Sequence, residues 1–360
     1  MSCRPRLVDD LIPLILSSSD CWWRRDLLRL ARISPAWLYN IRKRLYDTPV
    51  LYSPASCLLL ARTLSENPYL RTLIKGIELC PVSEGKFFSA DEMKSIRYIL
   101  SLNGLVSLTL GGDLSVGAER LLNSLSYPET IIKLHVNGSC RKDALGCPAS
   151  LEWDTVLASR FPELQRLELS NLDLDIVYPS FPSRLQISEL VLSNVQLVGG
   201  DLSHLLQDTD TLKYLCVSGE FSSEMDEQVS FVVESYGVEN LLYEVECMGA
   251  WRPTLFDEGL SLPSTLRVLQ LSGVRVDVET LNAVHRCYPN IEELKVTGRS
   301  VSLSVEDWVE FAKSAKCAKL ERLQVPEGTN EPPFRRWEDD NVLRAACCER
   351  GIVLYNSILG

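Results

Sequence analysis

The 360-residue sequence has few of the residues and none of the motifs that usually mark an active site. Its only three histidines are His135, His204 and His285, and they fall on different predicted elements. No Gly-x-Ser-x-Gly, P-loop or His-Glu-x-x-His pattern accompanies them. We therefore expect a protein that is not an enzyme, with no catalytic residue, no cofactor and no metal site.

Long apolar runs are missing as well. None approaches the roughly 20 residues that cross a bilayer, and MSCRPRLVDD at the start lacks the apolar core of a signal peptide. The 12 cysteines form no Cys-x-x-Cys pair, so we interpret them as reduced thiols. These absences favour a cytoplasmic or nuclear protein.

Positive charge is in deficit, with 37 Lys and Arg against 48 Asp and Glu, a net charge of -11. Nucleic acids and anionic membranes need clustered cations, so we expect neither as a partner and expect a protein instead. The first fifty residues run against this trend, with nine Lys or Arg and five Asp or Glu. Together with a length that exceeds one ordinary core, this predicts two different modules.

One short phrase repeats along most of the chain. It has an apolar residue, two variable residues, an apolar residue, one variable residue and a final apolar residue, as in LQRLEL and LRVLQL. Its ten copies begin at residues 74, 105, 131, 164, 187, 212, 238, 266, 291 and 320. The copy at Val238, VENLLY, is a poor one. Most spacings fall within the roughly 20 to 29 residues of leucine-rich repeats, and residues 70 to 355 resemble that family.

Amphipathic segments separate the phrases. Ser89 with Glu92 and Ser304 with Asp307 predict capping boxes, and 225–234, 278–287 and 339–350 have helical periodicity. Because one repeat cannot bury its apolar face alone, the repeats must stack. We expect an α/β fold in which a curved solenoid over residues 70–360 carries parallel strands on its concave face and leucines 105, 164, 212 and 266 line one core. Residues 51–69 should form a linker with a capping helix at 56–66.

The turn after each phrase departs from the usual repeat. Asn171 and Asn194 occupy the place of the consensus asparagine, whereas Gly219, Gly273 and Gly298 stand there in later copies. The asparagine ladder should therefore be incomplete.

The first fifty residues predict three helices. The first should begin near Asp10, so that Pro13 stays in its first turn; Asp26 should cap the second; Ser34 should cap the third, with Pro35 at its first position. Leu28, Leu30 and Trp37 are core candidates, and one of Trp22 and Trp23 should pack on the unit. A core this small is marginal on its own.

These residues resemble an F-box, the motif by which substrate receptors dock onto the Skp-type adaptor of cullin-based ubiquitin ligases. The pattern is met by Leu7, Asp10, Leu11, Ile15, Asp26, Leu27, Leu28, Leu30, Ile33, Ser34 and Trp37, while Val8 stands where the family has Pro. The whole arrangement is similar to F-box proteins of mushroom-forming fungi. The resemblance implies a substrate receptor that binds the adaptor, and through it a cullin, by Leu7, Leu11, Ile15, Leu27, Leu28, Leu30, Ser34 and Trp37. Leu11, Leu27, Leu28 and Trp37 should then be partly exposed.

An unidentified target protein would bind the concave face. Alternate residues of a strand point to opposite sides, which places ten candidates there: Lys133, His135, Arg166, Glu168, Glu189, Tyr214, Gln270, Glu293, Lys295 and Arg322. Any solvated sheet face would look similar. The alternative function is a non-catalytic scaffold or inhibitor whose first helices only cap the solenoid.

Overall fold

The protein was analysed as a computed structural model. It describes residues 7–18, 22–83, 87–138, 149–178, 185–206, 209, 212–220, 223–245, 256, 265–297, 302–314, 317–326 and 341–355. Gly298 and residues 356–360 of the predicted solenoid lie outside the described residues.

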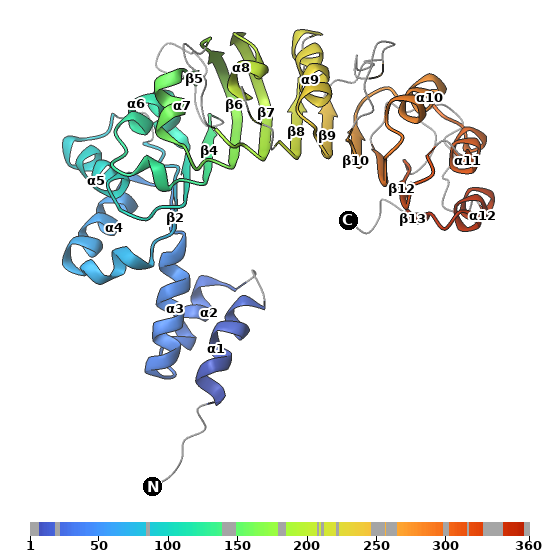
Figure 1. Ribbon diagram of the computed structural model, residues 1–360. Helices are drawn as coiled ribbons and strands as arrows, with labels where there is room; N and C mark the ends of the chain where they lie inside the picture. Colours follow the sequence, from blue (N-terminus) through green and yellow to red (C-terminus); the bar gives the residue numbers. More distant parts are fainter. Residues whose placement is uncertain are drawn as a thin grey trace.

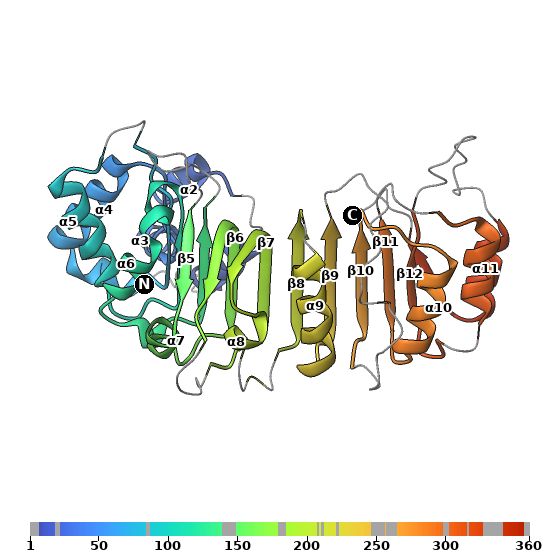
Figure 2. The ribbon, with the colours of Figure 1, turned by 90° about the horizontal axis from the view of Figure 1, so that it is seen from above.

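Within the described residues, 13 parallel strands form one open sheet. Figure 2 shows the strands side by side. Twelve of the strands follow one another in chain order, and β5 pairs beside this path with the second half of β6. The strands are β1 (Val50–Leu51), β2 (Gly76–Leu79), β3 (Ser107–Leu110), β4 (Lys133–Asn137), β5 (Ser150–Trp153), β6 (Arg166–Ile176), β7 (Glu189–Gly199), β8 (Tyr214–Gly219), β9 (Asn240–Val245), β10 (Val268–Ser272), β11 (Glu293–Thr297), β12 (Arg322–Gln324) and β13 (Val353–Tyr355).

The repeated phrase accounts for this sheet. Each of the ten copies forms a strand that begins two residues after the first apolar position, including β9, which arises from the poor copy at Val238. The fourth and sixth positions point inward, as Leu241 and Tyr243 do in β9. Leucines 105, 164, 212 and 266 belong to one continuous core, which confirms the repeat prediction.

Helices and short 3-10 segments connect the strands on the outer side of an arch, whose inner side is lined by the sheet (Figure 1). The α-helices of this part are α4 (Pro54–Glu66), α5 (Ala90–Leu100), α6 (Ala118–Asn123), α7 (Thr155–Arg160), α8 (Leu202–Leu206), α9 (Ser223–Ser235), α10 (Val278–Cys287), α11 (Val305–Lys313) and α12 (Asn341–Glu349). The 3-10 segments are η1 (Pro68–Leu73), η2 (Gly112–Gly117) and η3 (Pro128–Thr130). Both predicted capping boxes are present, at the starts of α5 and α11.

The turn after the strands carries a short asparagine ladder. The side-chain amide of Asn171 donates to Asn137 at 3.2 Å, and that of Asn194 donates to Asn171 at 3.2 Å. The ladder stops at Gly219, where a Cβ would lie 2.2 Å from the Asn194 Oδ1 atom. The expected incompleteness is confirmed, because glycine at this position has no side chain to continue the ladder.

The first fifty residues form three helices, α1 (Leu7–Ser17), α2 (Arg24–Leu30) and α3 (Pro35–Asp47). We call α1 to α3 the N-terminal unit. Its core of Ile12, Leu16, Leu27 and Ile41 is separate from the core of the solenoid. In Figure 1 the unit projects from one end of the arch.

Two predicted helix starts are wrong. α1 begins at Leu7, so Pro13 lies inside the helix; the packing of Ile12 and Leu16 maintains the helix although the proline removes one backbone hydrogen bond. α2 begins at Arg24, and Asp26 lies in its first turn, where its charge favours the helix dipole without capping it. The predicted cap of α3 is confirmed, because the Trp37 N–H donates to the Ser34 hydroxyl at 3.3 Å.

Candidate functional site

The N-terminal unit presents apolar side chains on its surface. On α1 the buried side chains are Ile12 and Leu16, so Leu11 and Ile15 face outward and Leu11 is 43% exposed. On α2 the same division puts Leu27 in the core and leaves Leu28 53% exposed. A unit with a core of four residues therefore leaves large leucine surfaces in contact with water.

The adaptor-binding candidates do not all lie on this surface. The expected exposure is confirmed for Leu11, Leu28 and the half-buried Trp37, and it is wrong for Leu27, which is only 5% exposed. The expectation that Leu28 belongs to the core is also wrong, because the adjacent Leu27 takes the inward position. Leu30 and Trp37 pack against the small core, and Ser34 caps α3. Leu7 begins α1, and its side chain lies outside the described part.

Further exposed apolar side chains extend this surface. Ile33, which meets the F-box-like pattern, is exposed. Leu14 and Tyr39 were missed from the sequence, although Leu14 follows Leu11 at helical spacing. Of the two tryptophans, Trp22 packs on the unit as expected, whereas Trp23 is 78% exposed. We call the exposed side chains Leu11, Leu14, Ile15, Leu28 and Ile33 the apolar surface of the N-terminal unit.

A short, hydrogen-bonded joint connects the N-terminal unit to the solenoid. α3 ends at Asp47 and β1 begins at Val50. The Lys75 N–H donates to the Asp47 carbonyl at 2.8 Å, and the Glu78 N–H donates to the Pro49 carbonyl at 3.1 Å. Tyr46 of α3 packs against the core of the solenoid. The joint thus positions the unit relative to the sheet.

The concave face holds the ten target-binding candidates in two rows across the strands. One row runs through Lys133, Arg166, Glu189, Tyr214, Glu293 and Arg322. The other row contains His135, Glu168, Gln270 and Lys295. All ten alternate with buried core residues, as the strand period requires.

One ion-pair cluster lies on β4, β6 and β7. The Arg166 guanidinium contacts Glu189 at 2.8 Å and Glu168 at 3.0 Å. The His135 Nε2 atom lies 3.6 Å from Glu168 and 3.3 Å from the Ser170 hydroxyl. Burial lowers the pKa of His135 below its usual value, more than the neighbouring Glu168 and Glu78 raise it. His135 is therefore neutral at neutral pH, and its contact with Glu168 is not an ion pair there.

A second cluster lies on β11 and β12, where the buried Glu293 carboxylate contacts Lys295 at 2.7 Å and Arg322 at 2.9 Å. The first cluster has one cation, Arg166, against two carboxylates, whereas the second has two cations against the one carboxylate of Glu293. The concave face therefore offers a locally negative and a locally positive charge pattern at separate places.

The strands between the two clusters carry mostly uncharged side chains on the concave face, and Glu244 of β9 is a charged exception. Tyr214 and Gln270 were expected there, and the structure adds Leu242 and Val268, with Val191 beside them on β7. Valine and leucine at a variable position look like ordinary β-formers in the sequence. Only the register of the strands shows that they gather in one central section.

Cys216 lies in the same central section of the concave face. Burial raises the pKa of its thiol, which disfavours the reactive thiolate.

Candidates for other chemistry are few in the part of the chain that the structure describes. The three histidines lie on β4, α8 and α10, so they form no common site. No group of three or more His, Cys, Asp or Glu residues in the described ranges could hold a metal ion. Within the same ranges, no helix has both the length and the apolar character to span a membrane.

Comparisons with known proteins add no identification. No protein-family model matches the chain, and no curated protein matches it. What the structure establishes is a mixed α/β fold with an open, parallel, repeat-built sheet preceded by three helices.

Proposed function

We propose that the protein is a substrate receptor of a Skp-cullin-F-box type ubiquitin ligase. The observation that supports this most is the exposure of Leu11 and Leu28 on a helical unit whose core is separate from the solenoid. Apolar side chains at two adjacent helices, outside any core, are typical of a docking surface. The unit would bind the adaptor in the cytoplasm or nucleus.

The concave face is the proposed site for the target protein. Its mostly uncharged central section would supply desolvated contact area, and the flanking ion pairs would supply specificity, because charges mismatched by a wrong partner are costly. The receptor then acts by proximity and carries out no chemistry itself: it raises the effective concentration of the target near the ligase.

The alternative is a scaffold whose N-terminal helices only cap the solenoid. The positions of β1 and α4 weigh against it. β1 pairs with β2, and α4 packs its buried face on the solenoid core, so these two elements already cover that end. A cap would also bury its apolar side chains against the solenoid core, whereas α1 and α2 bury some of theirs in a separate core and leave Leu11 and Leu28 exposed.

Copurification with a Skp-type adaptor tests the proposal. The wild-type chain should form a stable complex on size exclusion, and Leu11→Asp with Leu28→Asp should abolish it, because each change puts a charge where the adaptor would exclude water. Both side chains are exposed in the free chain, so the variant should remain folded.

A matched control separates a specific surface from a general charge effect. Val156→Asp with Phe231→Asp alters two exposed apolar residues on α7 and α9, and this variant should bind the adaptor like the wild type. If the wild-type chain does not bind the adaptor, or if the N-terminal variant binds normally, the receptor proposal is wrong and the scaffold is favoured.

A further inference from the structure

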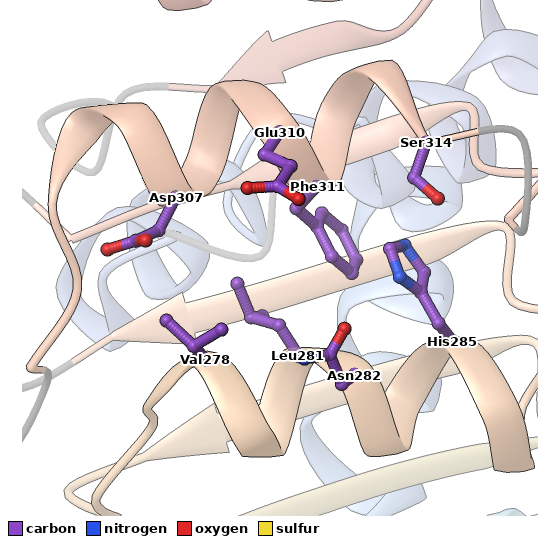
Figure 3. A pocket seen from close by; sticks show the side chains of 8 residues that line it. All are labelled: Val278, Leu281, Asn282, His285, Asp307, Glu310, Phe311 and Ser314. Carbon is purple, nitrogen blue, oxygen red and sulfur yellow. The ribbon is translucent and has the colours of Figure 1, made fainter.

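Helices α10 and α11 lie on the outer side of the arch, away from the concave face (Figure 1). A pocket lies between them (Figure 3). Its floor consists of the buried side chains Leu281, Phe311 and His285. Its rim carries the carboxylates of Asp307 and Glu310, which both come from α11. The pocket therefore combines an apolar floor with a negatively charged rim.

The size of the pocket limits what can enter it. Its volume is about 100 Å³. Pockets for cofactors and drug-sized ligands are several times larger, at about 300–1,000 Å³. The volume suits the end of one long side chain.

The rim favours a cation. Among the described residues, the Glu310 side chain has no ion-pair or hydrogen-bond partner. One Asp307 oxygen, Oδ2, accepts from the N–H and hydroxyl of Ser304, each at 2.8 Å. The cations of the same two helices, Arg286 and Lys313, do not line the pocket. A positive charge at the mouth of the pocket would thus lie near the carboxylate of Glu310, whose charge no other described side chain neutralises.

We propose that this pocket binds a lysine side chain of a partner protein. The methylene stem of lysine would pack on Leu281 and Phe311, and its ammonium would lie at the rim beside Glu310, as long charged side chains commonly distribute themselves between apolar surface and water. The negative net charge of the chain, -11, favours approach of a basic partner.

Lysine fits better than arginine because the aromatic surface is already occupied. The rings of His285 and Phe311 are stacked with centroids 4.3 Å apart and an interplanar angle of 6°. This stack covers one face of Phe311, while Trp308 meets Phe311 edge-on at 6.1 Å. A guanidinium gains much of its advantage from stacking on an open aromatic face, so the pocket gives it little benefit over an ammonium.

Three tripeptides test the proposal on the full-length chain: acetyl-Ala-X-Ala-amide with X as lysine, norleucine or arginine. Norleucine has the stem of lysine without the charge. In methyl NMR spectra, the lysine peptide should shift the signals of Val278 and Leu281 at millimolar concentration and saturate. The norleucine and arginine peptides should bind more weakly.

Two variants and a control make the result specific. Glu310→Gln should weaken binding of the lysine peptide by up to about fivefold, the upper range for an exposed ion pair. Asn282→Phe, at the pocket mouth, should abolish binding by filling it. Glu306→Gln removes an exposed charge of α11 that does not line the pocket, and it should leave the affinity unchanged.

The proposal is overturned if the lysine peptide shifts neither methyl signal, or if norleucine or arginine binds as tightly as lysine. An equal effect of Glu306→Gln and Glu310→Gln would also overturn it, because the attraction would then be general to the helix. The pocket is lined by residues of α10 and α11 and by Ser314, whereas adaptor binding is assigned to α1 and α2, so none of these results bears on adaptor binding.

Discussion

At the scale of single residues, His135 couples the concave face to pH. Burial lowers its pKa in the folded protein, whereas the unfolded chain takes up this proton near pH 6.5. Below that pH the unfolded state binds more protons, so the free energy of unfolding falls on acidification. The contribution of His135 is complete above about pH 6.5 and is lost as the pH falls through the lowered pKa.

We therefore predict that His135→Gln reduces the loss of stability between pH 7.5 and 5.5, as measured by urea unfolding of both proteins at each pH. His204→Gln, on α8, is the control and should follow the wild type. If the wild type and His135→Gln lose stability in parallel, His135 does not provide this dependence.

A second residue-scale prediction concerns Asn171, which has a positive φ of 54° and two side-chain hydrogen bonds in the ladder. Asn171→Ala loses both bonds and keeps the left-handed backbone, so it should lower the free energy of unfolding by about 2 kcal/mol. Asn171→Gly loses the same bonds without the backbone strain. Glycine should therefore cost less than alanine; the reverse order would show that backbone strain is unimportant here.

At the scale of elements, the two separate cores predict two independent stabilities. Ile12 is fully buried in the small core of the N-terminal unit, and Ile12→Ala should cost about 2–5 kcal/mol there. Amide hydrogen exchange should then show lost protection in α1 to α3 and unchanged protection in β6 to β8. Lost protection throughout the chain would mean that the cores unfold together.

The elements also show what the sequence could and could not predict. All ten phrases became strands because a period-two pattern of leucines has one way to bury its face. β1 was not expected, since two residues are too few to show a period. The start of α1 was mispredicted because Pro13 was weighed by local preference, while the packing of Ile12 and Leu16 outweighed it. Leu27 and Leu28 could not be assigned to core and surface until the start of α2 was known.

At the scale of the whole molecule, the inner strands of the sheet pair with the strands directly beside them. Leu241→Ala in β9 removes a buried side chain of the solenoid core and should cost about 2–5 kcal/mol. Because each repeat is stabilised mainly by its nearest neighbours, the loss of local stability should decline with distance from β9. Amide exchange should accelerate most in β8 to β10 and least in β2 and β12. Uniform acceleration would show that the solenoid unfolds as one unit.

The joint at residues 47–50 controls how far the distant end of the solenoid moves relative to the N-terminal unit, because a small rotation at the joint grows into a larger displacement with distance. Eleven steps between strands, at about 4.8 Å each, give the sheet a contour length of about 50 Å along the arch from β1 to β13. A rotation at Thr48 and Pro49 would move the far end of the arch by several ångströms, about 1.7 Å for every 10 Å of straight distance from the joint at a rotation of about 10°. The backbone hydrogen bonds that Lys75 and Glu78 donate across this joint therefore fix the orientation of the far end of the solenoid relative to the N-terminal unit.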